Sequence, residues 1–180
     1  MKYPMFKVHI NSEEAIEGLT KVLNSGFFNE GAQVSEFSEK LSKKMGYENI
    51  IMTNSCTSAL TMALKLSNVG YEDEVVTTSM TCLATNTPIL NLGAKVVWAG
   101  LPCDLERLLV ICEENNIKLI QDAAHAFGAK YKNKDVSFYA DYTCFSFQAI
   151  KHMTTGDGGA LICKSSEDAT RAKKMKSKFI

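Results

Sequence analysis

The sequence carries no net charge, because 20 lysine and arginine residues are balanced by 20 aspartate and glutamate residues. A chain with a pI near 6.8 has no overall field that would favour nucleic acid or an anionic membrane surface as a partner. The sequence also lacks an apolar run of the roughly 20 residues that a transmembrane helix needs, and its first residues do not resemble a signal peptide. We therefore expect a cytoplasmic protein that binds neither nucleic acid nor membrane.

The sequence lacks any C-x-x-C pair and any histidine spacing typical of a zinc site. Free cysteine behaves as a small apolar residue that is commonly buried. We therefore expect a reducing compartment, cysteines that mostly fill the core, and no metal site. The six cysteines are Cys56, Cys82, Cys103, Cys112, Cys144 and Cys163.

Helical patterns and short apolar strands alternate along the chain. At 180 residues and 46% hydrophobic content, the chain can bury one core. The periodicity predicts helices over 12–25, 34–45, 59–66, 83–92, 105–112 and 166–176, and strands over 50–53, 74–78, 95–98, 117–122, 142–147 and 160–163. This alternation predicts a single α/β domain with a largely parallel sheet, and no repeat or linker interrupts it.

Lys151 follows the apolar strand 142–147 and precedes the turn-rich run 154–159. A lysine held among apolar residues is partly removed from water, which lowers the pKa of its amine and favours attack on an aldehyde. Lys151 is therefore a candidate for Schiff-base formation. The alternative is that one of the chain's many lysines happens to follow a strand.

Hydroxyl side chains follow two of the predicted strands, at the ends where ligands bind in open α/β sheets. Thr57 and Ser58 open the helix after strand 50–53, where free backbone N–H groups suit a phosphate. An ordinary N-cap is the alternative. Ser146, five residues before Lys151, could reach the same phosphate or could bond to nearby backbone.

Asp122 ends an apolar strand and is followed by two alanines and His125. A buried carboxylate needs a cationic partner, and the protonated nitrogen of a pyridoxal ring is such a partner. A helix N-cap is the alternative for Asp122. His125 could bind a phenolic oxygen or lie satisfied in the core. Together with Lys151 and the phosphate site, these residues form the set that pyridoxal 5'-phosphate requires.

Several short motifs in this order give the sequence a family resemblance. They are Asn29-Glu30-Gly31 with Val34 and Phe37, Thr57-Ser58-Ala59-Leu60, 70–76, Gln121-Asp122-Ala123-Ala124-His125, and Ser146-Phe147 ahead of Lys151 and Gly158-Gly159. With them the chain resembles the DegT/DnrJ/StrS family of sugar aminotransferases, which are fold-type-I pyridoxal-phosphate enzymes. The resemblance implies a three-layer αβα sandwich with a mostly parallel sheet, the large domain of that superfamily. Residues 1–180 would form one incomplete large domain, with N-terminal helices over 1–46 and the αβα core over 47–180.

The resemblance also implies roles for individual residues. Lys151 would form the Schiff base and shuttle a proton, Asp122 would pair with the pyridine nitrogen, and His125 would contact the ring oxygen. Relatives that dehydrate their sugar carry histidine at the lysine position, so Lys151 favours transamination. The implied cofactor-binding set is Thr57, Ser58, Cys82, Asp122, His125, Ser146 and Lys151, with Cys82 where the family usually has a stacking aromatic.

The resemblance implies transamination of a nucleotide-linked keto sugar, with glutamate as amino donor, in polysaccharide or amino-sugar synthesis by a homodimer. Two departures qualify it. Near Ala99 the family has a further strand and helix, roughly 20 to 30 residues with connections, which we do not find in this sequence. The family also continues into a C-terminal small domain, which we expect to be absent from this chain. We therefore expect a gap in the sheet before the Asp122 strand. The alternatives are an inactive paralogue or fragment that serves as a binding module, and a lyase that uses Lys151 without a cofactor.

Overall fold

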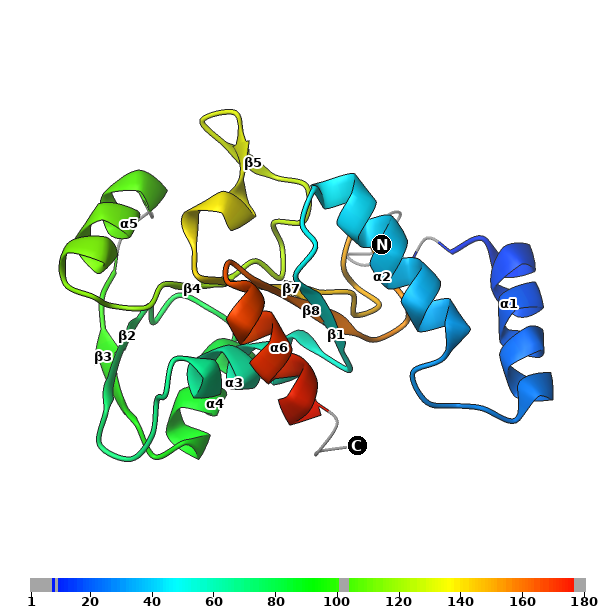
Figure 1. The fold of residues 1–180 in the computed structure, drawn as a ribbon, viewed down its shortest axis with the longest axis horizontal. Helices are drawn as coiled ribbons and strands as arrows, with labels where there is room; N and C mark the ends of the chain where they lie inside the picture. The colour runs from blue at the N-terminus through cyan, green and yellow to red at the C-terminus, as the bar shows by residue number, and fades with distance from the viewer. Residues whose placement is uncertain (1–7, 9, 101–103, 177–180) are drawn as a thin grey trace, which may run out of the picture.

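The computed structural model describes residues 8, 10–100 and 104–176, so Cys103 lies outside the described residues (Figure 1). The helices are α1 (Ser12–Ser25), α2 (Ala32–Met45), α3 (Cys56–Leu66), α4 (Leu83–Asn91), α5 (Leu105–Glu114) and α6 (Ser166–Lys176), with a 3-10 turn η1 (Val136–Tyr139). The strands are β1 (Ile50–Thr53), β2 (Glu74–Thr77), β3 (Lys95–Trp98), β4 (Ile120–Asp122), β5 (Lys130–Tyr131), β6 (Lys134–Asp135), β7 (Tyr142–Ser146) and β8 (Gly159–Cys163). The predicted alternation of helices and strands is confirmed.

The main sheet has four strands in the order β1-β8-β7-β4. Strand β8 pairs antiparallel with both β1 and β7, whereas β4 pairs parallel with β7. Strands β1, β7 and β4 therefore run in one direction and end at one edge, and β8 runs against them. This agrees with a mostly parallel sheet.

Strands β2 and β3 form a separate parallel pair. In the part of the chain that the structure describes, β4 is the edge of the main sheet and no strand pairs with its outer side. The sheet is thus interrupted between the β2–β3 pair and β4, as expected from the residues missing near Ala99.

Successive residues of a strand point to opposite faces of its sheet, so apolar residues on both faces of the main sheet need a covering layer. Helices cover both faces. Tyr142 and Cys144 of β7 pack with α3 and α6 in one buried cluster. Phe145 and Phe147 lie in a second buried cluster on the other face, with Leu41 of α2. The three-layer arrangement is therefore confirmed (Figure 1).

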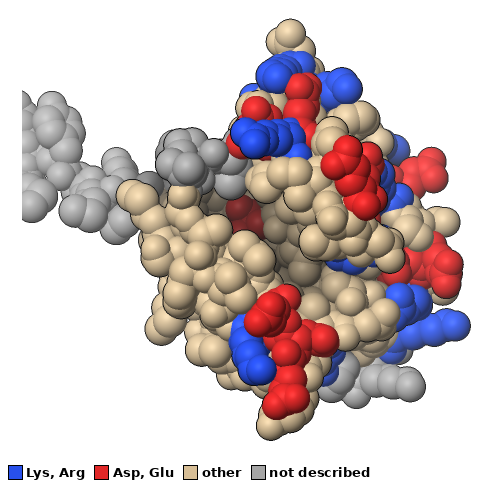
Figure 2. Space-filling view, turned by 90° about the vertical axis from the view of Figure 1, so that its left-hand side faces the viewer, with Lys and Arg blue, Asp and Glu red and all other residues tan. Residues whose placement is uncertain are grey.

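The β2–β3 pair is covered on one face only. Val75 and Val96 pack against α3 and α4. On the opposite face Val76 is 68% exposed, and its register partner Val97 is 37% exposed. Figure 2 views the side of the molecule that carries β2, β3 and α5, and this side is hollowed between walls of mostly uncharged side chains.

Two local features differ from the sequence prediction. Strand β4 begins at Ile120 and not at Ile117, because the Ile117 amide donates to Cys112 O (2.8 Å) and the Leu119 amide donates to Asp141 Oδ2 (3.0 Å). The β5–β6 hairpin was not predicted, since two-residue strands give no periodicity. Its turn residues Lys132 and Asn133 have φ values of 45° and 67°.

Candidate functional site

Gly159 brings the start of α3 close to the main sheet. A Cβ at this position would lie 2.5 Å from the carbonyl carbon of Ser55 and 2.6 Å from the amide nitrogen of Cys56. Gly159 is also the register partner of Ser146 in β7 and of Thr53 in β1. The first turn of α3 and Ser146 therefore lie together at the edge where β1 and β7 end.

The start of α3 combines a side-chain cap with free helix amides. Ser55 is the N-cap, and its Oγ accepts a hydrogen bond from the Ser58 amide at 3.1 Å. The Ser58 hydroxyl donates to Asn54 Oδ1 at 2.6 Å. The N-cap is therefore Ser55, while Thr57 and Ser58 lie inside the first turn. The amides of Cys56 and Thr57 belong to this turn and have no helical carbonyl partners, so they can receive an anion.

Ser146 lies at the carboxyl end of β7 and is buried. Its hydroxyl accepts a long hydrogen bond of 3.4 Å from the Gln148 amide. This bond to nearby backbone is the alternative that the sequence left open. A contact this long is weak, so the hydroxyl keeps capacity to donate to a ligand at the start of α3.

The Asp122 carboxylate at the end of β4 is held by donors on both oxygens. Oδ1 accepts from the Ala124 amide at 3.0 Å and faces the Cys56 thiol at 3.9 Å. Oδ2 accepts from the Thr85 hydroxyl at 2.7 Å. Asp122 therefore caps its own turn and does not open a helix, and its position is fixed from three directions.

The buried thiol of Cys56 is close enough to both Asp122 and Lys151 for the charge of each to affect its pKa. Burial raises the pKa of Cys56 to about 12, the negative charge of Asp122 adds to the rise, and the positive charge of Lys151 opposes it. The thiol is therefore neutral at physiological pH. Because both side chains act on one thiol, the acid and the amine predicted from the sequence lie in one region.

Lys151 and His125 are in direct contact, with 2.7 Å between Nζ and Nε2. Lys151 is partly buried, and its amide donates to the Gln148 carbonyl at 2.9 Å in the turn after β7. His125 is exposed, so the core interpretation of this residue is wrong. At this distance Nε2 either accepts from the lysine ammonium or donates to the neutral amine. The pair is therefore arranged to exchange a proton.

The first turn of α4 carries one predicted site residue and one that sequence reasoning missed. Cys82 is the exposed N-cap of α4; its carbonyl accepts from the Thr85 amide at 3.0 Å, and its side chain makes no capping hydrogen bond within the described part of the chain. Thr85, three residues later, bonds Asp122. Only the packing of α4 beside β4 reveals Thr85, since nothing in its local sequence distinguishes it from other threonines.

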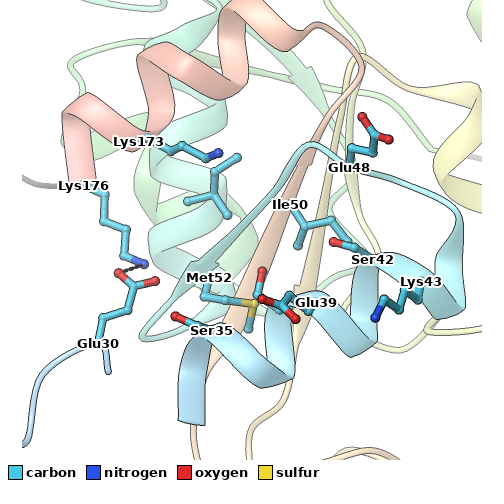
Figure 3. Close-up of a pocket in the computed structure, with 12 residues that line it drawn as sticks. Glu30, Ser35, Glu39, Ser42, Lys43, Glu48, Ile50, Met52, Lys173 and Lys176 are labelled. Carbon is cyan, nitrogen blue, oxygen red and sulfur yellow. Dashed lines mark ion pairs between the residues drawn. The ribbon is translucent and has the colours of Figure 1, made fainter. Parts of the chain in front are cut away.

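A cavity of about 700 Å³ lies elsewhere, between α2, β1 and α6 (Figure 3). Ser35 and Glu39 of α2, Met52 of β1 and Lys173 of α6 line it, and an ion pair joins Lys176 to Glu30 at one side. None of the predicted site residues lines this cavity. The candidate site is therefore an open region at the strand ends.

The donor set matches the groups of pyridoxal 5'-phosphate. Helix amides and hydroxyls suit its phosphate, a fixed carboxylate suits its ring nitrogen, and a lysine amine suits its aldehyde. Among the described residues, no group of three or more His, Cys, Asp or Glu side chains could hold a metal ion. None of the described helices is long and apolar enough to cross a bilayer.

Comparison with known proteins agrees with this chemistry. The model of the DegT/DnrJ/EryC1/StrS aminotransferase family matches residues 9–100 and 96–178. The spore coat polysaccharide biosynthesis protein SpsC of Bacillus subtilis is 28% identical, with 92% of this chain and 51% of the relative covered. A UDP-4-amino-4,6-dideoxy-N-acetyl-beta-L-altrosamine transaminase of Campylobacter jejuni is 32% identical, with 94% and 54% covered.

The fold is also similar to that of solved structures. The PLP-form of a putative sugar aminotransferase from Streptococcus pneumoniae superposes with a TM-score of 0.85 at 26% identity, over 97% of this chain and 56% of that one. The chain spans about half the length of the curated relatives it matches. The alignment with SpsC is 197 residues long, which is more than the 180 residues of this chain. SpsC therefore has residues within the aligned region that have no counterpart in this chain.

Proposed function

Because the chain belongs to the DegT/DnrJ/EryC1/StrS aminotransferase family, we propose that it binds pyridoxal 5'-phosphate and transfers an amino group to a keto sugar linked to a nucleotide. The observation that carries the proposal is the contact of Lys151 with His125 beside the fixed carboxylate of Asp122. Pyridoxal phosphate supplies an aldehyde that condenses with amines and a protonated ring that accepts electrons.

Each side chain has a role that its geometry supports. Lys151 presents its amine, and His125 holds or returns a proton at Nζ over 2.7 Å. Asp122 keeps a negative charge that stabilises a proton on a ring nitrogen. Thr57, Ser58 and Ser146, with the first-turn amides of α3, hold the phosphate. Cys82 offers less stacking area than an aromatic side chain, so the ring is held mainly by these polar contacts.

The substrate assignment rests on the relatives. The Campylobacter relative is a transaminase of a UDP-linked amino sugar, and SpsC belongs to spore coat polysaccharide synthesis. We extend this class of substrate to the present chain, with glutamate as amino donor and the cytoplasm as location. We also propose a homodimer, because the predicted apolar stripe of α1 is uncovered, with Ile16, Leu19 and Leu23 each more than 60% exposed.

Titration of the purified chain with pyridoxal phosphate tests the proposal. We expect the unchanged chain to show a visible absorbance band that is absent from Lys151→Ala. Addition of glutamate to the unchanged chain should then remove this band as the amine form of the cofactor appears. Lys164→Ala is the matched control, since Lys164 is an exposed lysine whose side chain forms a long ion pair of 3.8 Å with Glu113. A band of equal strength in the Lys151→Ala variant would refute the assignment.

A second candidate function is a binding module without catalysis, and the uncovered face of the β2–β3 pair favours it. Trp98 is the only tryptophan of the chain, and it lies at the end of β3, where it is 59% exposed. Its fluorescence therefore reports whether a partner covers this exposed end of the β2–β3 pair. A blue shift at rising protein concentration, combined with no cofactor band, would favour the module over the aminotransferase.

A further inference from the structure

The hydrogen bonds around Asp122 leave one place for a further donor. An ionised carboxylate offers about four lone-pair sites, two on each oxygen. In the described part of the chain, Oδ1 faces two donors, the Ala124 amide and the Cys56 thiol. Oδ2 accepts one, the Thr85 hydroxyl. The remaining site is therefore on Oδ2, the oxygen that Thr85 binds.

The Thr85 hydroxyl is itself fixed by a neighbour. Thr81 Oγ1 lies 2.9 Å from Thr85 Oγ1, one turn earlier. Because Thr85 has a single hydroxyl proton and gives it to Asp122, Thr81 must donate to Thr85. The hydrogen bonds thus run in one direction, from Thr81 to Thr85 to Asp122.

The position of α4 is fixed by the residue next to Thr85. The buried side chain of Asn86 accepts from the Thr77 hydroxyl at 2.9 Å and donates to the Thr78 carbonyl at 3.3 Å. Asn86 thereby holds α4 against the end of β2, while Thr85 reaches across to β4. The Thr85–Asp122 bond connects the β2–β3 unit to the main sheet across the interruption between them.

We propose that Thr85 is a positioning residue that directs the free lone pair of Asp122 Oδ2 toward the ring nitrogen of the cofactor. This inference rests on the proposed function. A donor on each oxygen prevents rotation of the carboxylate, so the proton of the ring nitrogen meets an acceptor in a fixed place. Without Thr85 the Asp122 carboxylate is held through Oδ1 alone and can rotate. Binding of the ring nitrogen must then also order this side chain, which weakens the interaction between Asp122 and the cofactor.

Binding of two cofactors to four proteins tests the proposal. The proteins are the unchanged chain, Thr85→Val, Thr85→Ser and Thr87→Val. The cofactors are pyridoxal phosphate and 1-deazapyridoxal phosphate, in which a C–H group replaces the ring nitrogen. Thr87 is the matched control, because it lies on the same helix and its hydroxyl donates to the Leu83 carbonyl of that helix at 2.9 Å.

We expect Thr85→Val to weaken binding of pyridoxal phosphate about tenfold, as for loss of one hydrogen bond to a charged group. Binding of the deaza cofactor should change by less than about twofold, since no ring nitrogen is present to sense Asp122. Thr85→Ser and Thr87→Val should bind both cofactors as the unchanged chain does. Equal weakening of both cofactors by Thr85→Val would overturn this inference alone. Failure of the unchanged chain to bind pyridoxal phosphate would overturn the proposed function and this inference with it.

Discussion

Gly159→Ala is expected to separate β8 from the start of α3. The added Cβ would lie 2.5 Å from the Ser55 carbonyl carbon and 2.6 Å from the Cys56 nitrogen. Carbon atoms in contact normally lie about 3.5–4.0 Å apart, so the two backbones must move apart by about 1 Å. Both partners are main-chain atoms, and no side chain can rotate away to relieve the contact. Overpacking of this kind costs about 1–3 kcal/mol, and we expect the upper part of that range.

Urea unfolding measures this loss directly. A decrease of about 2–3 kcal/mol corresponds to a midpoint lower by about 1 M. The same variant should bind pyridoxal phosphate weakly, because the helix start that holds the phosphate is displaced. Gly18→Ala is the control, since a Cβ there meets nothing within 4 Å and the residue lies inside α1. An unchanged midpoint for Gly159→Ala would refute the close approach on which the site geometry depends.

Two further predictions concern the cysteines. Burial raises the pKa of both Cys56 and Cys163 from 9.0 to about 12. The folded state therefore holds these thiol protons more tightly than the unfolded state does. The free energy of unfolding is constant below about pH 9 and falls as the pH rises from about 9 toward 12. Near pH 10 the loss is about 1 kcal/mol per thiol. The urea midpoint of the unchanged chain should be lower near pH 10 than near pH 8, and this difference should be smaller in Cys56→Ala. Equal midpoints at the two pH values in the unchanged chain would contradict the raised pKa of the buried thiols. Among the five described cysteines only Cys82 is exposed. Brief iodoacetamide treatment followed by mass spectrometry should therefore find Cys82 modified first. Earlier modification of Cys163 would show that the core is open to solvent.

Much of the fold could be predicted because it depends on local patterns. Gly46 ends α2 with φ of 74°, as expected for a glycine after a helical stripe. The buried strands β7 and β8 follow from short runs of mostly apolar residues. The interruption beside β4 could be anticipated from the family resemblance, which implies a further strand and helix near Ala99 that this chain lacks.

The features that could not be predicted depend on packing between distant segments. Thr85 reaches Asp122 only because α4 lies beside β4, at a separation of 37 residues along the chain. His125 was open to two interpretations, and its contact with Lys151 depends on how the turn after β7 folds back. The Asp122 carboxylate was predicted, but the three donors around it come from three different segments.

Identification of the residue that binds the cofactor tests the central claim most directly. The chain is mixed with pyridoxal phosphate, reduced with borohydride, digested and mapped by mass spectrometry. We predict that the stable adduct lies on Lys151 and disappears in Lys151→Ala. An adduct spread over surface lysines such as Lys132 and Lys164, unchanged by that substitution, would contradict a cofactor site at the ends of β4 and β7.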